Sequence, residues 1–184
     1  MTLTLKNTKS TKMAAFQDDC LPLEGLFESH DDLFKSINSY AEPRGYAFVT
    51  QRSIREKNGF LKVYFAYDRS RRPPSLDDLR EGKRRTTTRM TNCPFSVLVK
   101  ESSESWTLKH RPEVRFAIHN HEPSVHPSAH PVYRQLSGGT PQLAALSDAG
   151  LVPKEIQTVV RQSGSLATRQ DIYNCIAEVR RDFR

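Results

Sequence analysis

The chain has 184 residues, of which 36% are hydrophobic and 27% charged, and its formal net charge at pH 7 is +7. This length fits one ordinary domain or two small ones, and the low hydrophobic content predicts a modest core. No apolar run approaches the roughly eighteen residues that span a bilayer, and charged residues interrupt the N-terminus, which excludes a secretory signal; we expect a soluble, intracellular protein without a membrane partner.

The N-terminal residues 1–27 show no sustained hydrophobic period, and we predict a disordered tail there. From Ser29 to Ala41 apolar residues recur at helical spacing, and Ser29 with two following aspartates supplies a cap and negative charge at the helix start. This pattern predicts a short amphipathic helix that ends near Pro43.

Beyond this helix the hydrophobic period changes to two, which is typical of strands. Runs rich in β-branched and aromatic residues predict five short strands, over residues 46–52, 60–67, 94–100, 106–110 and 114–121. Asn58 and Gly59 supply the positive φ angles that hairpin turns favour. The expected fold class is therefore α+β, a small antiparallel sheet with one helix packed on it.

Positive charge is concentrated between Arg44 and Thr91, where 13 Lys and Arg residues stand against 5 Asp and Glu. Much of it lies in residues 69–90, a polar stretch that we interpret as a long loop projecting from the sheet. Such charges can simply keep a loop solvated. Lys and Arg interspersed with hydroxyl groups are also the usual donors to nucleic-acid phosphates.

The C-terminal part begins with prolines at 123, 127 and 131 and a glycine pair, which predict an extended linker over residues 123–140. Three helices are then expected, over residues 143–149, 153–160 and 168–183, in a helical segment that spans 141–184. They form either a helix-turn-helix unit or a bundle that only supports or links. Cys175 lies on the apolar face of the last helix and is expected in its core.

The stretch R-F-A-I-H-N-H-E-P-S places two histidines at the end of a predicted strand. Alternate side chains of a strand share a face, so His119 and His121 would project to the same side, as a pair of metal ligands does. Two surface histidines near a loop give the same pattern, and their partners decide between the two interpretations. Because Cys20, Cys93 and Cys175 are too few for a disulfide framework, metal binding is the function expected of any cysteine.

These features, taken in order, are a Gly-Tyr strand, a second strand, a basic loop, C-P-F, a Trp strand and H-N-H-E-P. Their arrangement resembles the far-red impaired response type DNA-binding domain, which belongs to the WRKY-GCM zinc-finger superfamily. H-N-H-E-P-S, followed by H-P-S-A-H-P-V-Y-R and T-R-Q-D-I-Y-N, is especially similar to the N-terminal part of fungal Mutator-like transposases. The resemblance covers about residues 28–180, with the DNA-binding domain itself over residues 28–122.

The resemblance implies a zinc ion held by Cys93, His119, His121 and a second cysteine. Where the family has Cys-Asp-Arg at the end of the second strand, this sequence has Tyr67, Asp68 and an arginine. A phenol is a poor zinc ligand compared with a thiolate. Three alternatives stay open: Asp68 completes the site, water completes a weaker site, or zinc is lost and the Tyr67 ring packs in its place. The departure favours a weakened or lost site.

The resemblance also implies that sheet edges and loops contact the major groove of duplex DNA. The first strand and its turn carry the types of side chain that suit base edges and phosphates, namely Gln51, Arg52, Arg55 and Lys57. The loop that follows the second strand would add phosphate contacts from Arg69, Arg71, Arg72, Lys83, Arg84, Arg85 and Arg89.

We therefore predict a nuclear, sequence-preferring DNA-binding module of the Mutator-like transposase type, or a captured relative that regulates transcription. Strand transfer needs clustered carboxylates that hold two metal ions, which the related full-length proteins carry further downstream, so no catalysis is expected of this chain. The alternative is an adaptor or transposon relic whose C-terminal helices dimerise or bind a protein partner. A zinc hydrolase that uses Cys93, His119 and His121 is disfavoured, because no general base is identifiable.

Overall fold

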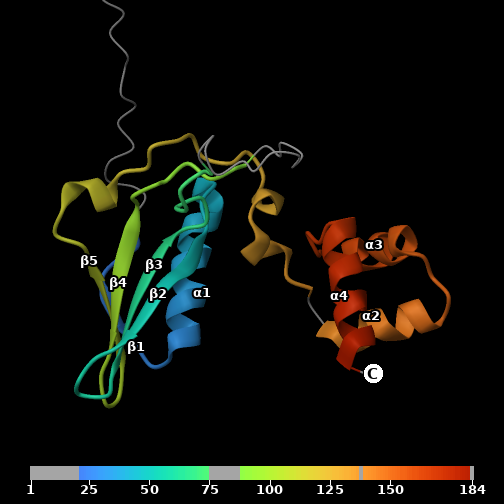
Figure 1. Cartoon of the computed structure of the whole chain (residues 1–184), viewed down its shortest axis with the longest axis horizontal. Helices are drawn as coiled ribbons and strands as arrows, with labels where there is room; N and C mark the ends of the chain where they lie inside the picture. Colours follow the sequence, from blue (N-terminus) through green and yellow to red (C-terminus); the bar gives the residue numbers. More distant parts are fainter. Residues whose placement is uncertain (1–20, 75–87, 137–138, 183–184) are drawn as a thin grey trace, which may run out of the picture.

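A computed structural model describes residues 21–74, 88–136 and 139–182 (Figure 1). A five-stranded antiparallel sheet carries helix α1 (His30–Ala41) on one face, and three further helices follow in the C-terminal part. This arrangement confirms the expected α+β class with a small antiparallel sheet. None of the helices in the described ranges is long and apolar enough to cross a membrane.

The strands are arranged in the order β1-β5-β4-β3-β2, so that β1 and β2 form the two edges of the sheet. Their bounds are Gly25–Phe27 for β1, Phe48–Arg55 for β2, Leu61–Tyr67 for β3, Ser96–Glu101 for β4 and Trp106–His110 for β5. Four of the five predicted strands are thereby confirmed. The β2–β3 hairpin closes at Gly59, which has a φ of 87°, whereas Asn58 does not have the positive φ that was expected of it.

The strand predicted over residues 114–121 is wrong. Residues Val114–Ala117 form a 3-10 helix, η2, and an irregular segment follows it. Only Phe116 of the apolar residues in η2 is buried, while Val114 and Ile118 remain exposed, so the alternating pattern did not reflect a buried strand face.

The position beside β5 belongs instead to β1, within the predicted disordered tail. Gly25 pairs with Leu108 and Phe27 pairs with Trp106, although Leu26 between them is 72% exposed. Backbone pairing and the packing of Phe27 therefore hold a segment whose composition gave no strand signal. Residues 1–20 of that predicted tail lie outside the described residues.

Helix α1 begins and ends as its sequence predicts. The Ser29 hydroxyl accepts a hydrogen bond from the Asp32 backbone N–H at 3.0 Å, and Leu33 and Ile37 face the sheet. The buried Asn38 side chain links this helix to β2, because its Oδ1 accepts from the Phe48 backbone N–H at 2.8 Å. Gly45 ends the following turn with a φ of 76°.

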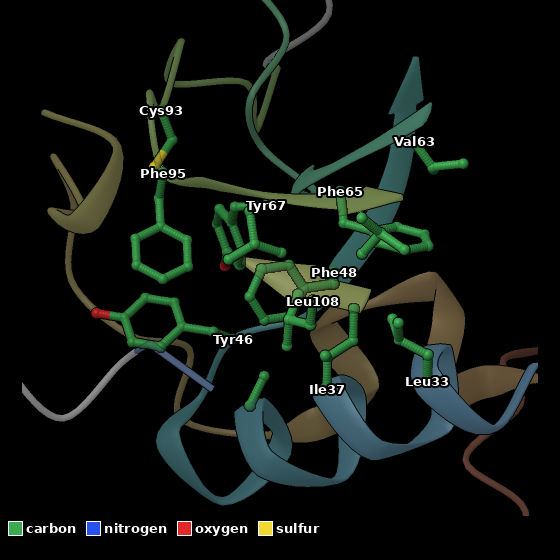
Figure 2. Close-up of a cluster of buried hydrophobic side chains, with 13 residues drawn as sticks. Leu33, Ile37, Tyr46, Phe48, Val63, Phe65, Tyr67, Cys93, Phe95 and Leu108 are labelled. Carbon is green, nitrogen blue, oxygen red and sulfur yellow. The ribbon is translucent and has the colours of Figure 1, made fainter. Parts of the chain in front are cut away.

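The core lies between α1 and the inner face of the sheet (Figure 2). Phe65, Val97 and Val99 are fully buried there, and each such side chain contributes about 2 kcal/mol to folding by leaving water. Phe95 and Cys93 extend this core beyond the start of β4. The core therefore reaches the region of the predicted metal ligands.

The segment predicted as an extended linker is folded against the sheet domain as far as Arg134. It forms two 3-10 helices, η3 (Pro127–Ala129) and η4 (Pro131–Arg134). Between them His130 is fully buried, and the Tyr133 hydroxyl donates a hydrogen bond to the Tyr46 carbonyl at 2.8 Å. The prolines that suggested an extended chain are the first residues of the two short helices. The composition did not reveal that His130 and Tyr133 form hydrogen bonds with the sheet domain.

The C-terminal helices are α2 (Gly139–Asp148), α3 (Pro153–Gln162) and α4 (Arg169–Asp182), which confirms that this part of the chain is helical. They share a small core made by Leu143, Ile156, Val160, Ile172 and Ile176. Cys175 packs partly buried beside this core. Whether the three helices act as a helix-turn-helix unit stays a prediction.

Candidate metal centre and nucleic-acid interface

Cys93, His119 and His121 form a group that could hold a metal ion, because their ligand atoms all lie within 4.8 Å of one another. The Cys93 sulfur lies 3.4 Å from Nδ1 of His119. Cys93 precedes β4, and the two histidines follow η2 in the irregular segment. The three residues predicted from the sequence thus come together, although no strand aligns the two histidines.

Aromatic stacking, rather than strand alternation, orients the histidines. The His119 ring lies between Tyr46 and Phe95, with centroid distances of 3.7 Å and 3.9 Å and interplanar angles of 6° and 16°. Figure 2 shows the rings of Phe95 and Tyr46 one above the other on this side of the core. His121 stacks in turn on Tyr67. The sequence did not identify Tyr46 and Phe95 as parts of the site. The only signals for them were that Phe95 lies two residues after Cys93 and that Tyr46 belongs to the Gly-Tyr strand.

The imidazoles are in the neutral form that binds metal ions. Burial, and to a smaller extent the neighbouring His121, lowers the pKa of His119 to about 3, and burial also lowers the pKa of His121. Nδ1 of His121 donates to the Glu122 carbonyl at 2.8 Å, which leaves the lone pair on Nε2. Both Nε2 atoms are buried without a hydrogen-bond partner among the described residues.

Burial raises the pKa of the Cys93 thiol, so this group is protonated at neutral pH without a metal. Only the thiolate binds zinc well, and a bound cation would therefore displace one proton from Cys93. The arrangement offers two imidazole nitrogens and one sulfur, which is the donor chemistry that zinc prefers.

Tyr67 stands at the cluster, where the resemblance implies a second cysteine. Its ring lies 4.6 Å from that of His121 and 5.3 Å from that of His119. Burial raises its pKa to about 12, and the neighbouring Ser124 hydroxyl opposes this rise only in part. The hydroxyl is buried and forms no hydrogen bond of ordinary length to a described residue. A protonated phenol of this kind is a poor substitute for a thiolate ligand.

Asp68 does not belong to the converging group of ligand atoms. Its carboxylate oxygen lies 2.9 Å from Nδ1 of His130, whose Nε2 lies 3.1 Å from the Gly45 carbonyl. Both ring nitrogens of His130 thus have a hydrogen-bond partner. This buried pair joins the end of β3 to the folded segment after residue 122.

The predicted DNA-contacting residues of the first strand lie on an open edge of the sheet. β2 pairs only with β3, and it is exposed from Thr50 to Ser53 around a bulge at Gln51. Gln51 and Arg52 line a hollow of about 470 Å³ together with two residues that the sequence did not single out, Tyr64 and Arg111.

Arg55 and Lys57 lie at the end of the β2–β3 hairpin. The Arg55 guanidinium donates to the Gly59 carbonyl at 2.6 Å, and Lys57 is exposed in the turn. Tyr64 lies directly opposite Arg52 on the outward side of β3, and alternation along the predicted strand 60–67 was the signal that could have placed it on that face.

The basic residues of the predicted loop divide into three groups. Arg69 donates to the Ser124 hydroxyl at 2.7 Å and Arg89 donates to the Ala129 carbonyl, so both fasten the loop ends to the folded segment after residue 122. Arg71 and Arg72 are exposed. The remaining predicted contacts lie outside the described residues, namely Lys83, Arg84 and Arg85.

Comparison with known proteins gives a partial match. The chain is 31% identical over 159 residues to the PKS-NRPS hybrid synthetase cheA of Chaetomium globosum. The match covers 84% of this chain but only 3% of that synthetase. No family model matches the chain, and no solved structure matches it.

Proposed function

We propose that this chain is a DNA-binding module that contacts duplex DNA through the β2 edge of its sheet and the basic loop after β3. The observation that carries the proposal is the exposed edge strand, on which Gln51 and Arg52 stand at a bulge and Lys57 stands at the hairpin turn. A two-stranded ribbon fits the major groove, and these side chains suit guanine edges, adenine edges and phosphates.

A zinc ion held by Cys93, His119 and His121 belongs to this proposal. Such an ion would tie the segment after η2 to the start of β4, which is a structural role. The pairing of Asp68 with His130 and the high pKa of Tyr67 favour a site of three protein ligands and one water. We expect such a site to bind zinc more weakly than one with four protein ligands.

The resemblance to the N-terminal part of fungal Mutator-like transposases supports a transposon origin and action in the nucleus. The exposed loop arginines Arg71 and Arg72 are compatible with phosphate contact. The expectation that this chain performs no catalysis remains a prediction.

A second candidate function is that of a protein-interaction adaptor. Apolar side chains on the helical segment favour it, since Val152, Val159 and Tyr173 are 53%, 37% and 51% exposed. A partner helix or a second copy could bury these side chains. Association of that kind would respond little to salt, whereas DNA binding would weaken steeply.

Hydrogen exchange of the chain, measured with and without a short DNA duplex of mixed sequence, distinguishes the DNA-binding module from the protein-interaction adaptor. The DNA proposal predicts slower exchange in β2 and in residues 56–59, with α4 unchanged. Protection confined to the C-terminal helices, or none in β2 under conditions where the duplex is bound, would refute binding through the sheet edge.

A further inference from the structure

The outer face of the sheet, opposite the face that packs on α1, carries cations from four neighbouring strands. Side chains alternate along each strand, so residues next to the buried Val63, Val99 and Leu108 point outward. The outward positions of β2 to β5 include Arg52, Lys62, Lys100 and Lys109. Among the described residues none of these four side chains forms an ion pair.

These residues form rows across the sheet. Arg52 lies opposite Tyr64, Tyr64 opposite Leu98, and Leu98 opposite Lys109. Lys62 lies opposite Lys100 in the next row. Three inter-strand steps from β2 to β5 span about 14 Å, which is the axial length of about four base pairs of duplex DNA.

The hollow lined by Gln51, Arg52, Tyr64 and Arg111 lies at the β2 end of this face. No carboxylate lines it, and its donors are two guanidinium groups, one amide and one phenol. A hollow with this chemistry suits an anion with several oxygen atoms, because a guanidinium can donate two parallel hydrogen bonds to phosphate.

Arg111 is held in place for such a contact. Its Nη1 donates to the Ser96 hydroxyl at 3.0 Å, and its Cζ lies 3.2 Å from the centroid of the Phe116 ring. The same carbon lies 5.3 Å from the Tyr64 ring centroid. Arg111 forms no ion pair with a described residue, whereas the nearby Arg115 is paired with Glu113 at 2.8 Å. The side chain is thus fixed by stacking while its charge remains available.

We propose that the hollow lined by Gln51, Arg52, Tyr64 and Arg111 binds one backbone phosphate of a nucleic-acid strand that continues across the outer sheet face toward Lys109. Arg52 and Arg111 donate to the phosphate oxygens, and the Tyr64 hydroxyl and Gln51 amide complete the contact. This inference rests on the proposed DNA-binding function and extends it from the β2 edge to the outer face. A free phosphate or a nucleotide shares the same chemistry, and the experiment distinguishes these sources.

Duplex affinity measured by fluorescence anisotropy at several salt concentrations tests the subsite. Each phosphate contact contributes about 0.9 to the slope of log affinity against log salt. Arg111→Gln is expected to reduce this slope by about one and to weaken binding about tenfold at low salt. Arg115→Gln removes the same charge four residues away, outside the hollow, and is expected to leave the slope unchanged. Equal slopes for the two variants would overturn the subsite while leaving DNA binding intact.

Arg111→Gln removes the stacking on Phe116 and could destabilise η2, so a second experiment does not use this variant. The unmodified chain is titrated with inorganic phosphate, and the side-chain N–H groups of its arginines are followed by NMR. Shifts of Arg52 and Arg111 that Tyr64→Phe weakens support the subsite, and tighter binding of duplex than of phosphate supports a strand as its occupant. If the chain binds phosphate in the hollow but does not bind duplex, the proposed DNA-binding function is refuted. The occupant of the hollow is then a free phosphate or a nucleotide and not a nucleic-acid strand. No shifts with phosphate or duplex would overturn the subsite.

Discussion

The phenol ring of Tyr67 stacks on the imidazole of His121, with ring centroids 4.6 Å apart and planes 20° apart. Tyr67, which stands where the resemblance implies a cysteine, therefore packs against a candidate ligand instead of competing with it. Its ring fills space in the core, where only 1% of the side chain is exposed. A site of three ligands can thus keep its shape without a fourth protein donor.

Tyr67→Cys is expected to strengthen zinc binding at this site by at least about tenfold, which corresponds to about 1.4 kcal/mol. A thiolate at this position supplies the fourth soft ligand that the phenol does not. Competition with a chromophoric chelator measures the affinity. Tyr67→Ser truncates the side chain equally without a thiol and serves as the control, and an equal gain in both variants would show that the sulfur does not bind the ion.

His130→Gln is expected to destabilise the sheet domain by about 1–3 kcal/mol, because it leaves the Asp68 side chain buried without its hydrogen-bond partner. The midpoint of urea unfolding reports this change. His126→Gln, in the preceding turn and more exposed, is the matched control and should have little effect. A similar small loss in both variants would contradict the role of the buried pair in holding residues 123–134.

Gly45→Ala tests how closely the folded segment approaches the turn after α1. A Cβ atom at Gly45 would lie 2.5 Å from the Ser124 carbonyl oxygen, and the residue has a φ of 76°. Gly59 has a φ of 87° but open space around its Cβ position, so Gly59→Ala carries only the backbone cost of about 1 kcal/mol. We expect Gly45→Ala to lower the free energy of unfolding clearly more than Gly59→Ala, and equal losses would argue against this contact.

Acidification is expected to destabilise the metal-free domain. His119 is neutral in the folded chain down to a pH of about 3, whereas in the unfolded chain it takes up a proton below about pH 6.5. The stability present above pH 6.5 is therefore lost as the pH falls, by about 1.4 kcal/mol per pH unit for such a group.

Denaturant unfolding with a chelator, at neutral and at mildly acidic pH, measures this loss. His119→Phe keeps an aromatic ring between Tyr46 and Phe95 but cannot titrate, so its stability should fall less on acidification. An equal loss of stability in the two proteins would show that His119 is not buried in its neutral form.

Much of the sheet could be predicted from the sequence, because β2 to β5 are rich in β-branched and aromatic residues and are bounded by turn residues. Helix α1 was equally readable, since Ser29, Leu33 and Ile37 combine a cap with an apolar stripe. β1 was missed because it depends on backbone pairing with β5 while Leu26 faces solvent.

The candidate metal ligands could be predicted from the sequence, but the aromatic residues that hold the two histidines in place could not. The histidine pair and the resemblance that added Cys93 predicted the group, yet the histidines converge through stacking on Tyr46, Phe95 and Tyr67 and not through a strand. Such contacts are made between residues distant in sequence, and local periodicity carries no trace of them. The same reason applies to the pairing of His130 with Asp68, which a proline-rich composition concealed.

The salt dependence of duplex binding by the zinc-loaded chain shows whether this chain is a DNA-binding module. Contacts to three or more phosphates predict that log affinity falls against log salt with a slope of at least about 2.7 in magnitude, and that a chelator weakens binding as the zinc tie is lost. Undetectable binding at low salt, or a slope near zero, would contradict the proposal that this chain is a DNA-binding module.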